Sequence, residues 1–127
     1  IINMSAVSGK IGNAKFAAYC ASKFGVIGFT QSLAREMAEH KVTVNAICPS
    51  LVDTERGFGM ASALKPDADT STEEWRDEMV AQTNANNPMG RIAQAKDVAD
   101  VAAFLASSQA DYLTGLAINV AGGSYMG

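Results

Sequence analysis

The chain has 127 residues, of which 48% are hydrophobic and 18% charged, and its formal net charge is −3. This length suits a single domain, and the composition is typical of a folded globular protein rather than a disordered one. The weakly negative charge, without a cluster of Lys or Arg, argues against nucleic acid or an anionic membrane surface as the main partner.

Cysteine and histidine are scarce in this sequence. Cys20 and Cys48 can either form one disulfide or stay as two small buried thiols, and a reducing compartment favours the thiols. Together with His40 they are too few for a structural zinc site, so we expect no metal. No apolar run approaches the roughly 18 residues of a membrane-spanning helix and no signal peptide is visible, so we expect a cytoplasmic protein.

The first predicted elements are a strand and a long helix. Ile1–Met4 is a candidate buried strand that runs into a turn of small residues ending at Gly12. A natural domain rarely opens inside such a unit, so we expect the sequence to be a piece of a longer protein. Apolar side chains spaced three and four residues apart then predict a helix from Phe16 to about Glu39.

A second strand and an irregular segment follow the long helix. The β-branched residues of Val42–Ile47 predict the strand, with a stop at Pro49. From residue 51 to about residue 69 the sequence is irregular, with a short helix near Gly59–Leu64. Ser71 and Glu74 have the spacing of a capping box and predict a helix to about Thr83.

The last part of the chain completes an alternation of strands and helices. The remaining expected elements are a loop, an amphipathic helix and a third strand: Asn84–Pro88, Asp97–Ser107 and Leu116–Val120. This alternation predicts an α/β fold of about three parallel strands joined by crossover helices. Parallel sheets require more neighbours and two covered faces, so the edge of Ile1–Met4 would be exposed and the chain is expected to associate with another surface.

Tyr19 and Lys23 are the first candidates for chemistry. They are four residues apart on the long predicted helix, so their side chains share one face. A phenol is too weak an acid to serve as a base near neutral pH, and a neighbouring ammonium favours the phenolate. Such a pair can move a proton to or from an alcohol oxygen. On these two residues alone, an interfacial tyrosine beside a solvated lysine remains the alternative.

Further short motifs accompany this pair along nearly the whole chain. In order they are Asn3-Met4-Ser5, Gly9, Gly12, Tyr19 to Val26, Val44 to Pro49, Val52-Asp53-Thr54, Pro88-Met89-Gly90-Arg91, Asp97-Val98-Ala99, Phe104 to Ser107, and Leu113-Thr114-Gly115 to Gly122-Gly123. Together they resemble successive motifs of the short-chain dehydrogenase/reductase family.

The resemblance implies a particular fold. Residues 1–127 would be a partial domain, the C-terminal half of a Rossmann-like doubly wound parallel sheet. The family's N-terminal half, which carries the glycine-rich nucleotide loop, would be absent.

The resemblance also assigns roles to single residues. Tyr19 would donate or accept the proton, and Lys23 would support it and hydrogen-bond the nicotinamide ribose of NAD or NADP. The segment Pro49–Thr54, which includes Ser50, would cradle the nicotinamide, with the Val52 backbone and the Thr54 hydroxyl near its carboxamide. For Thr54 alone, a helix cap is the alternative reading.

Three positions depart from the family pattern, and they are occupied here by Ala6, Ser50 and Ala121, which replaces a frequent Asp before Gly122-Gly123. The family usually places a substrate-orienting serine thirteen residues before the tyrosine, where this chain has Ala6, which cannot donate that hydrogen bond. Ser5 is the expected substitute in the catalytic set, and Ser8 is the alternative. Ser50 replaces a common glycine and would be strained if the backbone there requires a positive φ.

Residues 55–90 correspond to the region that covers the substrate in the family. Several large apolar side chains lie in it: Phe58, Met60, Trp75, Met79 and Met89. They predict either an adaptable lid or ordinary packing under a long loop. The length of the segment and its acidic residues are similar to those of members that act on polyols and sugars.

Three functional readings follow. In the first, the parent protein is an oxidoreductase that transfers hydride between NAD(P) and a small alcohol, polyol or carbonyl compound, with a 3-oxoacyl-type reductase as the variant. In the second, the chain is an inactive piece that serves only folding or oligomerisation. In the third, it is a binding protein that kept the fold. The long helix and residues 97–120 resemble the family's subunit contacts, so a homodimer or homotetramer is expected.

Overall fold

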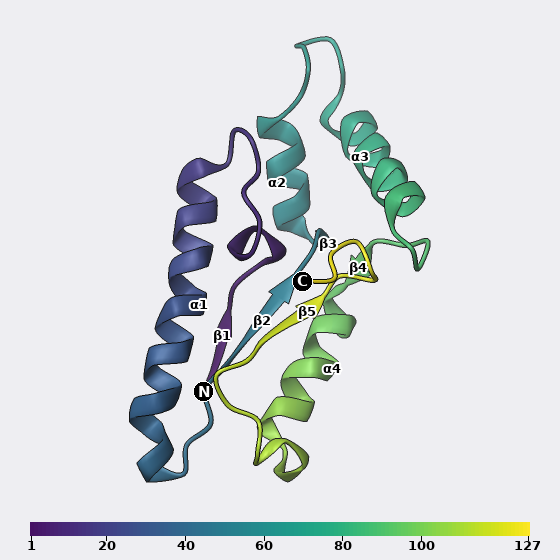
Figure 1. The fold of residues 1–127 in the computed structure, drawn as a ribbon. Coiled ribbons are helices and arrows are strands. Elements are labelled where there is room, and N and C mark those ends of the chain that lie inside the picture. The colour runs from purple at the N-terminus through teal and green to yellow at the C-terminus, as the bar shows by residue number, and fades with distance from the viewer.

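The computed structural model describes the backbone of residues 1–127 and the side chains of all of them except Phe58 and Ala61. A three-stranded parallel sheet forms its centre, and the strand order is β1-β2-β5. The strands are β1 (Ile2–Met4), β2 (Asn45–Pro49) and β5 (Ala117–Val120). The predicted α/β fold with three parallel strands and crossover helices is confirmed (Figure 1).

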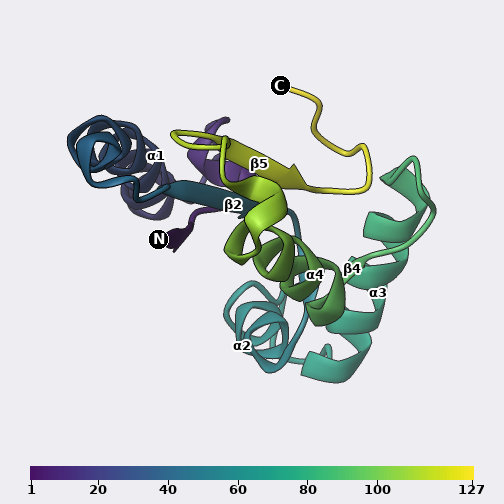
Figure 2. The same cartoon turned by 90° about the horizontal axis from the view of Figure 1, so that it is seen from below.

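Two helices cover opposite faces of this sheet (Figure 2). On one face, α4 (Ala95–Ala106) packs through Leu105 against Ile47 and its neighbours in the hydrophobic core. On the other face lies α1 (Ala17–Met37), which buries Cys20, Thr30 and Ala34 and is joined to β1 by a hydrogen bond from Asn3 Nδ2 to Thr30 Oγ1 at 3.0 Å. Successive residues of a strand point to opposite faces, so β1 sends its side chains alternately to the two helices.

The strand β1 lies at an edge of the described sheet. It pairs with β2 on one side, and on the other side the described residues place no strand beside it. Ile1 and Met4, at its two ends, are about half exposed. The prediction that the edge of Ile1–Met4 is exposed is therefore confirmed for the described chain.

A smaller unit lies beyond the carboxyl end of β2 (Figure 1). It consists of the parallel two-residue strands β3 (Val52–Asp53) and β4 (Ala93–Gln94) and of two helices, α2 (Glu55–Ala63) and α3 (Thr72–Asn86). The segment expected to be irregular is thus mostly ordered as a strand and a helix. Two-residue strands have no sequence period of their own and depend on pairing within the fold.

Helix α3 begins as predicted and ends later. Ser71 Oγ accepts from the Glu74 N–H, and Glu74 Oε2 accepts from the Ser71 N–H, both at 3.1 Å, which confirms the capping box. The helix continues to Asn86, so the predicted loop from Asn84 was placed too early.

The second strand was also misplaced. It was predicted over Val42–Ile47 with a stop at Pro49, whereas β2 spans Asn45–Pro49. Lys41 has a left-handed φ of 59° after the helix, so the chain needs several residues to enter the sheet. Pro49 is tolerated because it is the last residue of the strand, where the next N–H, that of Ser50, donates to Val120 O at 3.1 Å. Among the residues that the structure describes, no helix combines the length and the apolar character that crossing a bilayer requires.

Candidate active site

The candidate site residues gather where the parallel strands end. Ser5 follows β1, Ser50 follows β2, and Tyr19 and Lys23 lie in the first half of α1. In open parallel sheets, the crevice outside the carboxyl ends of the strands is the usual ligand site. The fold therefore brings the residues singled out in the sequence to one end of the sheet.

Tyr19 and Lys23 share one face of α1, as their spacing predicted. The Lys23 Nζ lies 5.7 Å from the centroid of the Tyr19 ring and donates a hydrogen bond to the Met4 carbonyl oxygen at 3.0 Å. That carbonyl belongs to the last residue of β1, so the lysine links the helix to the strand end. The Phe16 ring packs edge-on against Tyr19 with centroids 6.4 Å apart.

Arg56 contributes a second cation to Tyr19. This residue lies in the first turn of α2, and its guanidinium carbon is 5.4 Å from the centroid of the Tyr19 ring. The sequence analysis missed it, because Arg56 is distant from Tyr19 in sequence and only the placement of α2 in the fold brings the two together. Its one signal in the sequence is a basic residue directly after the Val52-Asp53-Thr54 motif.

The two serine hydroxyls near Ala6, those of Ser5 and Ser8, have different hydrogen-bond partners. Ser5 is buried, and its Oγ donates to the Lys23 carbonyl oxygen at 2.8 Å. Ala6 is buried as well. Ser8, in the short 3-10 helix η1 (Val7–Gly9), is half-buried, and its Oγ accepts a hydrogen bond from Asn13 Nδ2 at 2.9 Å. The Ser5 hydroxyl therefore donates its proton to the backbone of α1, whereas the Ser8 hydroxyl accepts a hydrogen bond.

The segment Pro49–Thr54 begins at the end of β2. The Oγ of Ser50 is buried and has no hydrogen-bond partner within the described structure. Its backbone is not left-handed, so the strain considered for a serine at this position is absent. The exposed Thr54 directs its Oγ1 to the Val52 carbonyl oxygen at 3.4 Å, a long contact, rather than to an N–H of α2.

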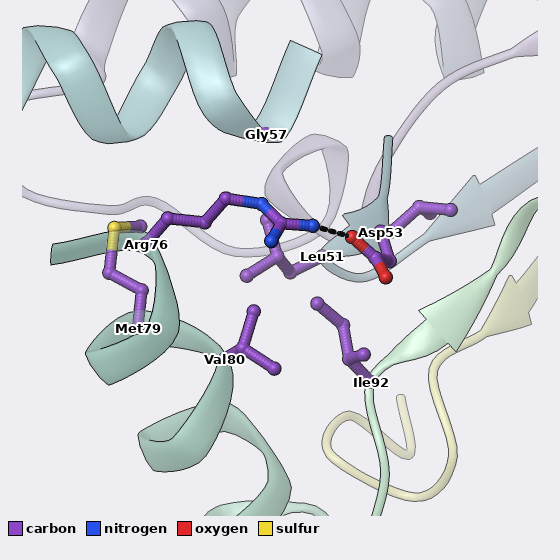
Figure 3. Close-up of a pocket in the computed structure, with 8 residues that line it drawn as sticks. Leu51, Asp53, Gly57, Arg76, Met79, Val80 and Ile92 are labelled. Atoms are coloured by element: carbon purple, nitrogen blue, oxygen red, sulfur yellow. Dashed lines mark hydrogen bonds and ion pairs between the residues drawn. The ribbon is translucent and has the colours of Figure 1, made fainter. Parts of the chain in front are cut away.

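Asp53 ties this segment to α3. Arg76 of α3 donates to Asp53 Oδ1, and Figure 3 shows its guanidinium reaching across a small pocket to the carboxylate. The pocket is lined mainly by aliphatic side chains: Leu51, Val52, Met79, Val80 and Ile92. Helix α3 is therefore held to the end of β3 by an ion pair that lies above an apolar contact.

The large apolar side chains of residues 55–90 do not share one environment. Met79 lines the pocket beneath Arg76, and Met60 is half-buried. The Nε1 of Trp75 is buried without a described hydrogen-bond partner, whereas Met89 is 69% exposed. The side chain of Phe58 lies outside the described residues.

The two cysteines and the histidine do not come together at one place in this structure. Cys20 and Cys48 are both buried free thiols, and burial raises the pKa of Cys48. His40 is exposed, and its Nε2 lies 3.5 Å from Glu39 Oε1. Among the described residues, no group of three or more His, Cys, Asp or Glu side chains is placed to hold a metal ion.

Known proteins share both the sequence and the fold of this chain. A family described as "Enoyl-(Acyl carrier protein) reductase" matches residues 1–125. The 3-oxoacyl-[acyl-carrier-protein] reductase of Vibrio cholerae is 43% identical over 126 residues, which are 99% of this chain and 46% of that protein. The chain thus spans about half the length of the curated relatives that it matches.

Solved structures agree with these matches. A 3-oxoacyl-[acyl-carrier protein] reductase from Brucella melitensis with bound NAD is 34% identical, with a TM-score of 0.78 over 100% of this chain and 41% of its own. The F189W actinorhodin polyketide ketoreductase with NADPH is 37% identical, with a TM-score of 0.85 over 98% of this chain and 46% of its own. The family match and these likenesses show that the chain belongs to the short-chain dehydrogenase/reductase family.

Proposed function

We propose that the protein is an NAD(P)-dependent oxidoreductase that interconverts an alcohol and a carbonyl compound, with Tyr19 as the proton donor or acceptor. The observation that carries this proposal is the placement of Tyr19 and Lys23 together at the carboxyl end of β1, where Lys23 bonds the last strand carbonyl. The names of the relatives, 3-oxoacyl reductases above all, support the same reaction class.

The protein's own part in the reaction is the handling of one proton. In reduction, the Tyr19 hydroxyl protonates the oxygen of the carbonyl group, and in oxidation the phenolate removes the alcohol proton. The Lys23 ammonium, 5.7 Å from the ring, stabilises the negative charge that the phenol oxygen carries in either direction. The bound nicotinamide coenzyme supplies or takes up the hydride.

The residues at the strand ends suit such a coenzyme. Ser50 has a buried Oγ without a described partner, directly after β2, and a ligand amide or hydroxyl group would satisfy it. The segment Pro49–Thr54 follows the same strand and leaves the Thr54 hydroxyl exposed. We assign Pro49, Ser50, Val52 and Thr54 to the coenzyme's nicotinamide end and Lys23 to its ribose.

The second donor to the substrate oxygen is proposed from the hydrogen-bond pattern. The Ser5 proton is used by the Lys23 carbonyl, so Ser5 acts at the centre mainly by fixing the helix that carries Tyr19. Ser8 accepts from Asn13 and keeps its own proton to donate. We expect Ser8→Ala to lower kcat by about a hundredfold, the usual cost of one such donor. A kcat that stays within twofold would return the role to Ser5.

The substrate is proposed to be a carbonyl compound of the 3-oxoacyl type, because the curated relatives carry that name. Their names do not support the polyol reading drawn from loop length. Residues 55–90 are proposed to cover the substrate, with the Arg76–Asp53 ion pair holding the cover to β3. The cytoplasmic location stays a prediction.

Coenzyme binding tests the proposal against the alternative of an inactive folding or oligomerisation unit. The protein expressed from its complete gene should bind NADP or NAD with micromolar affinity in calorimetry and should oxidise the reduced coenzyme when a 3-oxo ester is added. An inactive unit gives neither heat nor oxidation. Absence of both signals in a sample whose melting curve is cooperative would contradict the proposed function.

A further inference from the structure

Arg56 is a cation at the catalytic tyrosine that the proton chemistry does not require. Its guanidinium carbon lies 5.4 Å from the centroid of the Tyr19 ring, and Lys23 Nζ lies 5.7 Å from the same point. Lys23 also bonds the β1 carbonyl of Met4. Two positive charges thus flank one phenol, and only Lys23 is anchored to the sheet.

The described structure gives Arg56 no acceptor. None of the hydrogen bonds or ion pairs found among the described residues includes its guanidinium, and the residue is exposed. The nearby Asp53 is already paired with Arg76. Glu55 is the adjacent residue on α2, and consecutive helical side chains do not face each other.

An arginine in this position has a specific chemical preference. Its planar guanidinium presents donors in a fork that matches two oxygens of a carboxylate or phosphate group. A cation stacked on an aromatic ring keeps that fork free at its edge. The two cations near the Tyr19 ring favour an anion bound beside them. These features together describe a binding site for an oxyanion beside the phenol.

We propose that Arg56 binds a carboxylate or phosphate group of the substrate whose carbonyl or alcohol oxygen lies at Tyr19, an assignment that rests on the function proposed above. Because the guanidinium lies against the tyrosine ring, the anionic group and the reacting carbon belong to one small molecule and are close to each other in it. The 3-oxo compound proposed above therefore carries a free carboxylate or phosphate group near its reacting carbon rather than ending in a neutral ester, and Arg56 is its specificity residue.

Matched probes test this assignment in the protein expressed from its complete gene. Acetoacetate is compared with ethyl acetoacetate, and dihydroxyacetone phosphate with dihydroxyacetone, in wild type, Arg56→Met and Arg56→Lys. The first pair tests a carboxylate and the second a phosphate. Arg35→Met is the matched control, since Arg35 is an exposed arginine in the last turn of α1. Steady-state kinetics give kcat and KM, and calorimetry gives the affinity for acetoacetate and dihydroxyacetone phosphate.

The expected result is a difference between charged and neutral probes. Arg56→Met should raise KM for the preferred anionic probe at least about tenfold and weaken its binding equally, while KM for the neutral partner stays within twofold. Any change in kcat that follows from removing a cation beside Tyr19 should be the same for the charged and the neutral probe. The KM of Arg56→Lys for the anionic probe should lie between those of wild type and Arg56→Met. The KM of Arg35→Met should equal that of wild type. Equal changes in KM for the charged and neutral probes, or no change in KM, would overturn the assignment of Arg56 alone. A wild type that reduces none of the four probes would overturn the proposed function with it.

Discussion

At Gly9 the turn after β1 approaches the backbone of helix α1 closely. A Cβ at this position would lie 2.4 Å from Ser5 Oγ and 2.7 Å from the Lys23 carbonyl oxygen. These two atoms form the hydrogen bond that holds α1 against the strand end. The absence of a side chain at Gly9 therefore sets the position of the helix that carries the proposed acid/base pair.

We predict that Gly9→Ala destabilises the protein by about 2 kcal/mol, because the methyl group must displace backbone atoms of α1. Gly12→Ala is the control, since nothing lies within 4 Å of its added Cβ. Thermal unfolding of both variants measures the effect. Equal melting temperatures for the two variants would contradict the close approach at Gly9.

The parts of the site that the sequence could predict are local ones. Tyr19 and Lys23 share a face because a helix places residues four apart on one side, which the sequence states directly. Arg56 meets Tyr19 only through the placement of α2, and Ser5 bonds the Lys23 carbonyl only through the packing of α1 on the turn. No regular sequence spacing predicts either contact, so both are visible only in the structure.

At the scale of elements, local signals predicted helices better than short strands. The Ser71–Glu74 capping box fixed the start of α3 because both hydrogen bonds lie within one turn. The strands β3 and β4 were missed, since each has two residues and exists through pairing with the other. The misplacement of β2 has the same origin, because its last residue, Pro49, is defined by its register with Val120.

Helix α4 begins at an ion pair that makes its stability depend on pH. Asp97 accepts from Arg91 at 2.7 and 2.8 Å and from the Gln94 N–H at 2.8 Å. These contacts hold the pKa of Asp97 well below its ordinary value, with Arg91 the main cause. A carboxyl whose pKa is lowered by folding stabilises the fold above its unfolded pKa of about 4 and loses that contribution as the pH falls through its folded value.

Asp97→Asn should therefore lower the melting temperature at pH 7, and the difference from wild type should shrink as the pH falls below about 4. Asp100→Asn is the control, because its pairing with Lys96 is an exposed contact within one helix and contributes little. Melting curves from pH 7 to pH 2.5 give the comparison. A difference that stays constant with pH would show that the Asp97 carboxylate is not the cause.

At the scale of the whole molecule, the described chain leaves apolar surface uncovered. The edge of β1 is unpaired among the described strands, and Phe24 and Phe29 on α1 are 46% and 58% exposed. A sheet edge and an apolar helix face both favour association. The fold class was predictable because few arrangements are compatible with this alternation of strands and helices. No local sequence pattern predicts what covers the exposed apolar surface.

We predict that the protein self-associates through surfaces that include α1. Phe29→Asp should shift the mass measured by light scattering toward that of a monomer, because a charge would be buried at the contact. Ser62→Asp, at an exposed residue of α2, is the control, because it adds the same single negative charge away from α1. A wild-type monomer at high concentration would contradict the prediction.

The turnover of Tyr19→Phe in the protein expressed from its complete gene tests the central claim, that Tyr19 moves the proton with Lys23 beside it. The variant removes one oxygen and keeps the ring between Lys23 and Arg56. Tyr112→Phe is the matched control, because Tyr112 is fully exposed and lies after the C-terminal end of α4. The account predicts that Tyr19→Phe lowers kcat by about a thousandfold while coenzyme affinity and melting temperature stay unchanged. A kcat equal to that of Tyr112→Phe would contradict it.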